Sequence, residues 1–341
     1  MKLLMLAPTP FFSDRGCHIR VLNSYLNLQD IGHNVLLLTY PLGRDMDGVE
    51  TKRISKVPGY HQTKPGFSFY KPFLDFLLLF KAIKEMLIGK YDVVYAHLYE
   101  GAFIGYFLKI IFRKKLIFDN QGSLTGELTT QKTIKKNSLV FKIVYRLEKF
   151  IIQKSDEIIA SNEGLKKILL DNFQVKNIVV EEDLPNDTLF NSQVQSAKLD
   201  LPKNKIVITY LGGLQLYKGL DYLLNAIAST DYRFHFLIMG YPEKDCQRIA
   251  KELGILNRIT FTGKIPYEQA PAYLKLGNIA ISLKTTDSGE ANAKLYNYIA
   301  MGLKVICFDL PENRRILKDN GIYVRNKDTS DLVNKINMLK L

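Results

Sequence analysis

The chain has 341 residues, of which 47% are hydrophobic and 24% are charged, proportions typical of a globular enzyme and unlike those of a disordered protein. This length accommodates two domains, each with a core of its own. The net charge is +13, and residues 51–150 hold 18 Lys or Arg against 7 Asp or Glu, a local excess of +11. Such a concentration predicts an anionic partner for that part of the surface, the alternative being a basic face that only aids solubility.

Three widely separated cysteines without metal-binding spacing fit a reducing compartment. Residues 1–7 have neither the basic start nor the cleavage site of a signal peptide, and they are typical of a first strand. The longest apolar stretches, residues 76–80 and 101–112, are too short or too interrupted to cross a bilayer. We therefore expect a cytoplasmic protein that is soluble or lies on the inner face of the cell membrane.

In chain order, short apolar runs alternate with amphipathic stretches, a pattern typical of parallel strands joined by crossover helices. The strands predicted in the first half are residues 2–7, 34–40, 92–96, 115–119 and 157–160. A polar segment from Pro185 to Lys205, with a second proline at Pro202, then interrupts the alternation and predicts a linker at residues 186–205. The strands predicted beyond it are residues 206–211, 235–239, 258–262, 278–283, 304–308 and 322–325.

These elements predict an α/β fold of two Rossmann-like domains with parallel sheets, residues 1–185 and residues 206–341. We expect the two domains to face each other across a cleft, because loops at the carboxyl ends of parallel strands are where such sheets bind ligands. The last helix, near residues 329–339, either packs on its own domain or crosses back to the first.

The first candidate loop of the second half contains Gly212 and Gly213, directly after a predicted strand, and Lys218 near the start of the next helix. Glycine lets the backbone approach a ligand closely, and a lysine at a helix start attracts phosphate. This loop therefore predicts a phosphate site, the alternative being a tight turn with a surface lysine.

Two further loops follow strands in this half. Residues 284–295 are polar and offer backbone N–H groups to a diphosphate, and Lys294 shares one helix face with Asn297, three residues on. Gly240 and Tyr241 form a loop in which a nucleotide base could stack. The alternatives are an exposed loop with ordinary capping and a tyrosine that merely lies at the surface.

Six segments resemble, in order, motifs of the retaining glycosyltransferases of family 4, which have the GT-B fold. They are residues 8–17 (PTPFFSDRGC), 32–35 (GHNV), 155–161 (SDEIIAS), 184–187 (LPND), 211–219 (LGGLQLYKG) and 294–302 (KLYNYIAMG). The resemblance covers nearly the whole chain. It implies an enzyme that transfers a hexose-type sugar, with retention, from a nucleotide-diphosphate sugar to a glycan or lipid-linked acceptor, in cell-surface polysaccharide or glycolipid synthesis.

The family's site residues carry over with two departures. Lys218 matches the lysine that neutralises the donor diphosphate, but Gly213 stands where an arginine is usual. Glu290 lies near the first position of the family's glutamate pair, and Asn297 occupies the second, which usually bonds the ribose hydroxyls. His97 matches a histidine that faces the donor sugar, the alternative being a capping or packing histidine.

The loops after the strands and the resemblance together give three catalytic residues, ten donor-binding residues and four residues on the acceptor side. The catalytic residues are His97, Lys218 and Glu290. The donor-binding residues are Gly16, Gly213, Lys218, Gly240, Tyr241, Glu290, Ala291, Asn292, Lys294 and Asn297. The acceptor-side residues are Asp14, Arg15, Asp119 and Asn120.

Family membership would imply front-face attack, with the leaving diphosphate assisting deprotonation of the acceptor. Lys218 and the amides around residues 290–294 would stabilise the charge that builds on the diphosphate, in place of a divalent metal. The sequence shows no acidic pair and no His/Cys cluster with metal-ligand spacing, so we expect neither a metal nor another cofactor.

The basic excess suggests a partner for residues 107–154. Residues 107–115 and 140–154 interleave lysine and arginine with large apolar residues, as helices that lie on anionic lipid do. An anionic membrane surface is therefore a candidate partner, and a soluble acceptor is its rival.

Three other classes of protein stay open. A nucleotide-sugar epimerase would need acid/base carboxylates and no acceptor. A non-catalytic nucleotide-sugar binder is suggested by Gly213 and Asn297. A nucleic-acid protein is suggested only by charge, and since no recognised nucleic-acid motif is present, we expect no nucleic-acid partner.

Overall fold

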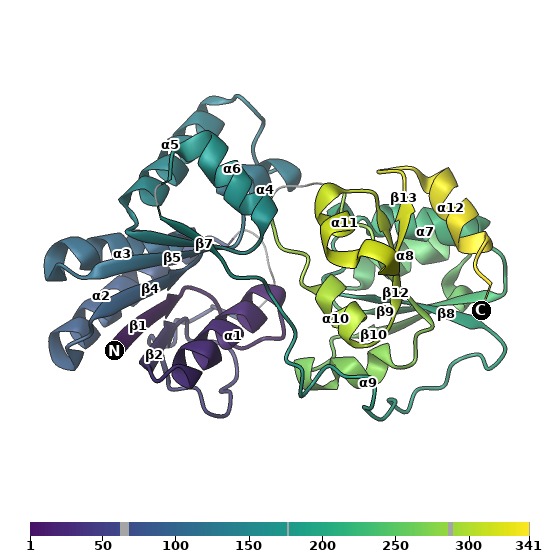
Figure 1. Cartoon of the computed structure of the whole chain (residues 1–341), viewed down its shortest axis with the longest axis horizontal. Coiled ribbons are helices and arrows are strands. Elements are labelled where there is room, and N and C mark those ends of the chain that lie inside the picture. The colour runs from purple at the N-terminus through teal and green to yellow at the C-terminus, as the bar shows by residue number, and fades with distance from the viewer. Residues whose placement is uncertain (62–67, 176, 286–288, 341) are drawn as a thin grey trace. The chain divides into compact units, whose positions relative to one another are not determined.

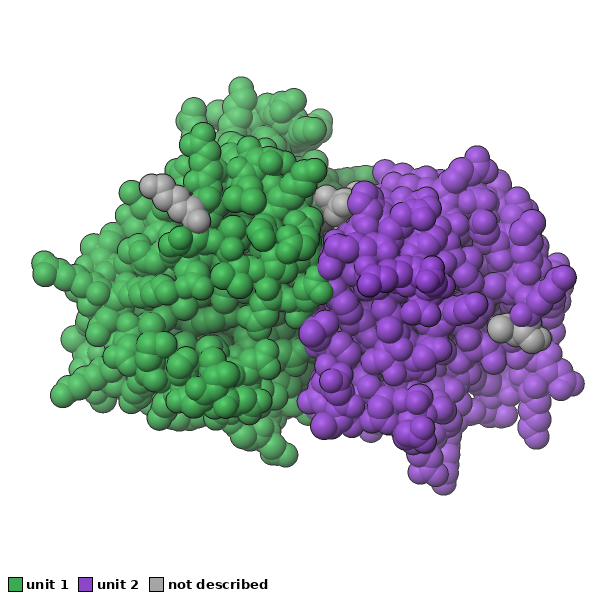
Figure 2. All heavy atoms as spheres, viewed as in Figure 1, with its two compact units in different colours: residues 1–182, 288–291 green, residues 183–287, 292–341 purple. Residues whose placement is uncertain are grey.

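The computed structural model describes residues 1–61, 68–175, 177–285 and 289–340 (Figure 1). Within these residues the chain forms two compact units. Unit 1 comprises residues 1–182 together with residues 289–291, and unit 2 comprises residues 183–285 and 292–340 (Figure 2).

Unit 1 is built on a sheet of seven parallel strands in the order β3-β2-β1-β4-β5-β6-β7. The strands are β1 (Lys2–Ala7), β2 (Asn34–Thr39), β3 (Thr51–Arg53), β4 (Val93–His97), β5 (Lys115–Asn120), β6 (Glu157–Ala160) and β7 (Ile178–Val180). Because β1 lies between β2 and β4, the chain winds in one direction from β1 to β3 and in the other from β4 to β7. This reversal is the switch point at which sheets of this kind bind ligands.

Six helices accompany this sheet in the described part of unit 1, and polar residues at their starts explain where three of them begin. The helices are α1 (Gly16–Asp30), α2 (Lys71–Gly89), α3 (Leu98–Phe112), α4 (Leu124–Thr130), α5 (Leu139–Lys154) and α6 (Glu163–Phe173). The side chains of Ser123, Ser138 and Asn162 accept hydrogen bonds from the first backbone N–H groups of α4, α5 and α6. Such caps satisfy donors that a helix leaves unpaired at its start.

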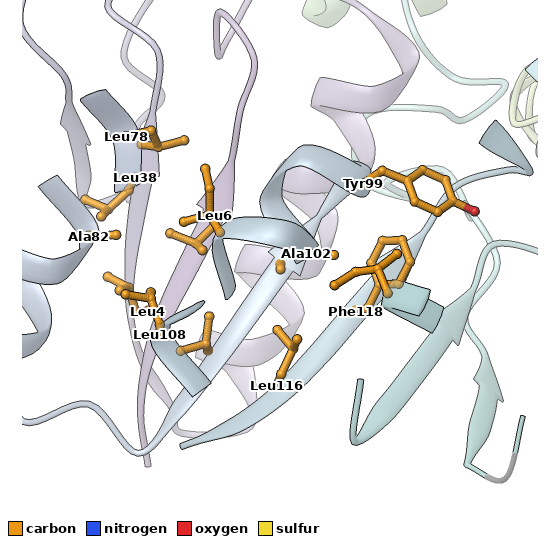
Figure 3. Packing of buried hydrophobic residues seen from close by; sticks show 14 of the residues in the cluster. Leu4, Leu6, Leu38, Leu78, Ala82, Tyr99, Ala102, Leu108, Leu116 and Phe118 are labelled. Atoms are coloured by element: carbon orange, nitrogen blue, oxygen red, sulfur yellow. The ribbon is translucent and has the colours of Figure 1, made fainter. Parts of the chain in front are cut away.

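The core of unit 1 lies between the strands and the helices that cover them (Figure 3). Leu4 and Leu6 of β1 are fully buried, as is Leu38 of β2. On α2, Leu78 and Ala82 recur at a spacing of four residues, which keeps them on one face of the helix against this cluster. Strands that are apolar over most of their length are expected where a parallel sheet is buried.

Unit 2 contains a second parallel sheet of six strands in the order β10-β9-β8-β11-β12-β13. The strands are β8 (Ile206–Leu211), β9 (Phe234–Met239), β10 (Ile259–Gly263), β11 (Ile279–Ser282), β12 (Lys304–Phe308) and β13 (Gly321–Val324). Its winding also reverses, here at β8, which lies between β9 and β11.

The helices of unit 2 are shorter than those of unit 1. They are α7 (Leu220–Ser229), α8 (Lys244–Glu252), α9 (Ala270–Leu274), α10 (Lys294–Ala300), α11 (Pro311–Leu317) and α12 (Thr329–Asn337), with 3-10 turns at η1 (Leu216–Lys218), η2 (Leu256–Arg258), η3 (Tyr267–Gln269) and η4 (Lys318–Asn320). Helix α12 contacts α7 and β13, and its Leu332 and Ile336 belong to the core of this unit. The last helix therefore packs on its own unit.

The predicted pair of parallel α/β sheets is confirmed. Each of the eleven predicted strands is present, with its ends shifted by at most one residue. Two edge strands, β3 and β7, were not predicted, because runs of three residues carry too little pattern to be recognised. Residues 181–205, between β7 and β8, form neither helix nor strand. Across the described residues, every helix is too short or too polar to cross a membrane.

Candidate functional site

The predicted site residues gather near the carboxyl ends of the strands at the two switch points. In unit 1, Asp14, Arg15 and Gly16 follow β1, and His97 is the last residue of β4. In unit 2, the loop after β8 carries Gly213 and Lys218, and the loop after β11 leads to Lys294. In each unit, these residues thus lie at the carboxyl ends of the strands, which we call the carboxyl edge of the sheet. There a doubly wound fold leaves room for a ligand.

A buried ion-pair network lies at this edge of unit 1. The parallel register places His97 of β4 beside Asp119 of β5, and the His97 Nδ1 lies 2.7 Å from the Asp119 Oδ2. From α1, the Arg20 Nε donates to both carboxylate oxygens of Asp119 at 2.9 Å. All three side chains are buried. Arg20 was not among the residues predicted from the sequence.

This network keeps Asp119 ionised. Burial alone would raise the pKa of Asp119, but the positive charges and hydrogen bonds of Arg20 and His97 outweigh it and hold that pKa well below its usual range. An ionised Asp119 only accepts hydrogen bonds, so the Nδ1 of His97 carries the proton that it shares. The His97 Nε2 is buried and has no hydrogen-bond partner among the described residues.

The side chain of the neighbouring residue Asn120 also forms hydrogen bonds with groups of the protein. Its Nδ2 donates to the Tyr99 hydroxyl at 3.1 Å, and its Oδ1 accepts from the backbone N–H of Gly122 at 3.0 Å. The Tyr99 hydroxyl in turn donates to Glu148, which is fully buried. Asp119 and Asn120, predicted on the acceptor side, are therefore completely buried, with hydrogen bonds to protein groups that position the loop after β5.

Three predicted residues of the first loop lie at or close to the start of α1. Asp14 has a left-handed backbone conformation, with φ of 55°, and it accepts an ion pair from Arg44 at 2.8 Å. Arg15 is the residue that precedes the first turn of α1, and Gly16 opens that helix. The backbone of this loop thus brings charged side chains to the switch point of unit 1.

Glu290 and Ala291 group with unit 1, as Gly16 does, whereas the other predicted donor-binding residues belong to unit 2. The Nδ2 of Asn162, at the start of α6, donates to the carbonyl of Gly289 at 2.8 Å. A Cβ atom at Gly122 would lie 3.2 Å from the Cγ of Glu290, so the two residues are in close contact. The part of the predicted loop formed by residues 286–288 lies outside the described residues.

In unit 2, glycines bring three loops into backbone contact. Gly219 has φ of 89°, and a Cβ there would lie 1.8 Å from the carbonyl oxygen of Leu283, where β11 has just ended. A Cβ at Gly240 would lie 1.8 Å from the carbonyl oxygen of Gly212. Because only glycine allows such approaches, the loops after β8, β9 and β11 form one continuous backbone surface.

Lys294 projects onto this surface. Its Nζ lies 3.2 Å from the Tyr210 hydroxyl and 4.2 Å from the centre of the Tyr210 ring. A Cβ at Gly212 would lie only 2.9 Å from the same nitrogen. Tyr298 holds the helix in place, since its hydroxyl accepts from the backbone N–H of Leu211 at 2.8 Å. Asn297, half-buried, lies on the same short helix, α10.

The remaining predicted residues of unit 2 have different surroundings. The carbonyl of Gly213 accepts from the Tyr210 hydroxyl at 3.0 Å, and Lys218 is the last residue of the turn η1. Tyr241 follows β9, and the ammonium of Lys264 lies 5.7 Å from its ring centre. Asn292 is buried and bonded to Ser282 and Asn313. These contacts give Asn292 a part in holding the loop.

Among the described residues, no three His, Cys, Asp or Glu side chains are grouped so that they could hold a metal ion. Two cavities of unit 1, of about 290 and 210 Å³, are both lined by Asn34, the first residue of β2. They therefore lie at the amino end of that strand, opposite the edge that carries the predicted residues.

Comparison with known proteins assigns this architecture. Residues 205–340 match the family model described as Glycosyl transferases group 1. An uncharacterized glycosyltransferase of Methanocaldococcus jannaschii is 26% identical over 242 residues, which are 66% of this chain and 59% of that protein. The chain thus spans less than two thirds of the length of that relative.

Two solved structures are similar over almost the entire chain. Sucrose-phosphate synthase from Thermosynechococcus elongatus has a TM-score of 0.81 at 16% identity, covering 98% of this chain and 88% of that one. HepE of Anabaena, solved with UDP and glucose, has a TM-score of 0.74 at 15% identity, covering 99% and 89%. The chain therefore has the GT-B fold, as predicted. The match to the Glycosyl transferases group 1 model lies in its C-terminal part, residues 205–340.

Proposed function

We propose that this protein is a glycosyltransferase that moves a hexose-type sugar from a nucleotide-diphosphate sugar to a glycan or lipid-linked acceptor, with retention at the anomeric carbon, as in family 4. The observation that carries the proposal is the lysine-bearing, glycine-lined surface at the switch point of unit 2, within the region that matches group 1 glycosyltransferases. The UDP and glucose bound by HepE support the class of donor.

Unit 2 supplies the groups that would hold the diphosphate. Lys218 ends the turn η1 and Lys294 begins α10, so both cations stand beside the loops whose backbones meet at Gly219 and Gly240. Fixed positive charges stabilise the negative charge that develops on the leaving diphosphate, and they do so without reorganisation during the reaction. We therefore propose transfer without a metal or other cofactor. Gly213, Tyr241 and Asn297 would contact the nucleoside.

Unit 1 supplies a rigid polar group. With its Nδ1 held by Asp119, His97 is left with one nitrogen, Nε2, for a sugar hydroxyl. We propose this contact as the catalytic role of His97, and Glu290 as a second polar contact of the sugar. Asp14 and Arg15, at the start of α1, would bind the acceptor. Asp119 would hold His97 in position, and Asn120 would hold the loop after β5.

The proposed location is the cytoplasm, with residues 107–154 touching the anionic inner face of the cell membrane. The interleaved basic and apolar residues of α5, and the basic residues 113–115 that follow α3, support this part of the proposal. A lipid-linked acceptor would then be reached at the surface of the bilayer.

A second candidate function is a non-catalytic nucleotide-sugar binder. Gly213 replaces an arginine and Asn297 replaces a glutamate of the resembled motif, and either change removes a charged contact with the donor. Such a protein would bind the donor and release no product.

The test of both functions is a thermal-shift screen of the full chain against UDP, GDP, ADP, TDP and CMP, with and without magnesium. A ligand that binds only the folded state stabilises it by about 2.7 kcal/mol at a hundredfold excess over its Kd. We expect one nucleotide to raise Tm without magnesium, and Lys218→Ala to abolish that shift. Lys251→Ala, a change of an exposed lysine on α8, is the matched control.

Turnover separates the two candidates. The cognate nucleotide sugar is incubated with a mixture of glycan and lipid-linked acceptors, and release of the nucleoside diphosphate is measured. Release that depends on an acceptor supports the transferase, whereas binding without release supports the binder. If none of the five nucleotides shifts Tm, the roles given to Lys218 and Lys294 are wrong.

A further inference from the structure

Three helices of unit 1, α2, α3 and α5, lie next to one another over the same core. Helix α3 contacts α2 on one side and α5 on the other. Leu78, Leu108 and Ile151, one from each helix, are buried in a single cluster. In Figure 1, α2 and α3 run side by side at the edge of unit 1. The three outward sides therefore form one surface, which we call the three-helix face.

Large apolar side chains cover this face although it is exposed. On α2, Phe76 and Phe80 are 54% and 53% exposed, and their rings stack edge to face at 4.6 Å. The other exposed apolar residues of the face are Phe73, Leu87 and Ile88 on α2, Phe107, Ile110 and Ile111 on α3, and Leu139, Val140, Ile143, Leu147 and Phe150 on α5. Apolar residues gathered in this way mark a site of interaction, because water solvates them poorly.

The acidic and basic side chains of the three helices differ in their exposure to solvent. Every acidic side chain is buried or half-buried and bonded to the protein: Asp75 to Tyr40, Glu85 to Lys52, Glu100 to Lys71 and Glu148 to Tyr99. Exposed cations, in contrast, lie among the apolar residues: Lys84 on α2, and Lys142, Arg146 and Lys149 on α5. The three-helix face is therefore apolar and cationic.

The combination of apolar and cationic residues on this face indicates the kind of partner that it binds. A second copy of the chain would bring like charges together, which disfavours self-association through this face. An anionic lipid surface satisfies both kinds of residue, since its headgroups attract lysine and arginine while its interface accepts aromatic and aliphatic side chains. Long cationic side chains also keep their ammonium groups at the headgroups while their stems stay apolar.

We propose that the three-helix face is a docking surface for an anionic lipid bilayer and that α2 supplies its aromatic contact, through Phe73, Phe76 and Phe80. This deepens the membrane contact proposed above for residues 107–154, because it adds a helix outside that range. The docking surface rests on the proposed function in one respect: a lipid-linked acceptor would be reached at the bilayer.

The experiment is flotation of the full chain with vesicles, without any nucleotide. We expect the protein to float with vesicles that contain about one third phosphatidylglycerol and to stay behind with neutral phosphatidylcholine. Raising the salt from about 0.05 to 0.5 M is expected to weaken binding, because charges at the surface are screened. The Tm of each variant is measured in parallel to show that it is folded.

Variants separate the two kinds of contact. Phe76→Ser with Phe80→Ser is expected to lower binding roughly tenfold at both salt concentrations, because it removes buried apolar area. Lys142→Glu with Arg146→Glu is expected to lower it roughly tenfold at low salt only. The matched controls are Ile31→Ser and Lys251→Glu, exposed residues outside the three-helix face, which are expected to leave binding unchanged.

Three results would overturn the docking surface: equal binding to neutral and anionic vesicles, binding unaffected by the α2 pair in folded protein, or a dimer that the α2 pair dissociates in the absence of lipid. Because the assay contains no nucleotide, its failure leaves the donor site of unit 2 standing. Conversely, a protein that binds no nucleotide and still floats keeps the docking surface and loses the proposed function.

Discussion

Units 1 and 2 share one topology but prepare the carboxyl edges of their sheets by different means. In unit 1 the edge is held by buried side chains, with Arg20, Asp119 and His97 locked in one network. In unit 2 the edge is formed by backbone, with Gly219 and Gly240 admitting contacts that any side chain would block.

The difference teaches how the same sheet can serve two tasks. Buried ion pairs fix the position and protonation of a few atoms, which suits a group that must be aimed at one spot. A glycine-lined backbone with cations beside it offers many donors to a large anionic ligand. The two edges should accordingly respond to substitution in different ways.

The largest expected effect is in the network of unit 1. Asp119→Ala leaves the Arg20 guanidinium buried without its carboxylate, and we expect the free energy of unfolding of unit 1 to fall by about 3–5 kcal/mol. Denaturant unfolding measures the loss. Asp30→Ala, an exposed change on the same helix as Arg20, is the control. A loss below about 1 kcal/mol would show that the network does not hold this edge together.

A smaller loss is expected from the backbone of unit 2. Gly219→Ala combines a left-handed backbone with a Cβ that overlaps the Leu283 carbonyl, and we expect a cost of about 3 kcal/mol. Gly254→Ala separates the two causes, since Gly254 has φ of 69° but nothing within 4 Å of its Cβ position. Gly16→Ala in unit 1 has neither problem and should be neutral in denaturant unfolding. Equal costs at Gly219 and Gly254 would contradict the proposed backbone contact.

The third effect concerns binding in unit 2. Lys294→Ala removes a cation from the glycine-lined surface, and we expect donor affinity to fall by about 2 kcal/mol, or roughly thirtyfold in Kd. Isothermal titration with the nucleotide found by thermal shift measures it. Asp119→Asn in unit 1 should leave nucleotide affinity unchanged while it lowers turnover. If both variants lost nucleotide affinity equally, the division of tasks between the edges would be wrong.

The smallest effect is a dependence on pH that originates in unit 1. Burial raises the pKa of Asp75 to about 6, with Glu100 adding to the shift and the Tyr40 hydrogen bond opposing it. A carboxyl whose pKa is raised on folding stabilises the fold below its unfolded pKa, and that contribution disappears as pH rises through the folded value. Between about pH 4 and 6 the free energy of unfolding should therefore fall by about 1–2 kcal/mol.

Asp75→Asn tests this origin, because the amide still accepts a hydrogen bond from Tyr40 but does not ionise. The variant should be more stable than the parent at pH 7 and should lose most of the decline between pH 4 and 6. Thermal unfolding across this range measures the change. A decline that persists in the variant would place the titrating group elsewhere.

The sequence predicted the strands because most are apolar runs of four to six residues, and it missed Thr51–Arg53 because three polar residues carry no period. It also placed His97 and Asp119 at the ends of successive strands. It could not place Arg20 with them, because an arginine 99 residues from its partner leaves no local signal. The grouping of Glu290 with unit 1, apart from Lys294, is likewise decided by tertiary contacts that no spacing encodes.

One helix turn of α5 has two sides with different partners. Leu147 and Lys149 lie on the exposed side, whereas Glu148 between them accepts hydrogen bonds from the backbone N–H groups of Leu124 and Thr125. The same carboxylate accepts a hydrogen bond from the Tyr99 hydroxyl, which in turn accepts one from the Nδ2 of Asn120. Glu148 therefore connects the helix that carries part of the three-helix face to the start of α4 and, through Tyr99, to Asn120 at the end of β5.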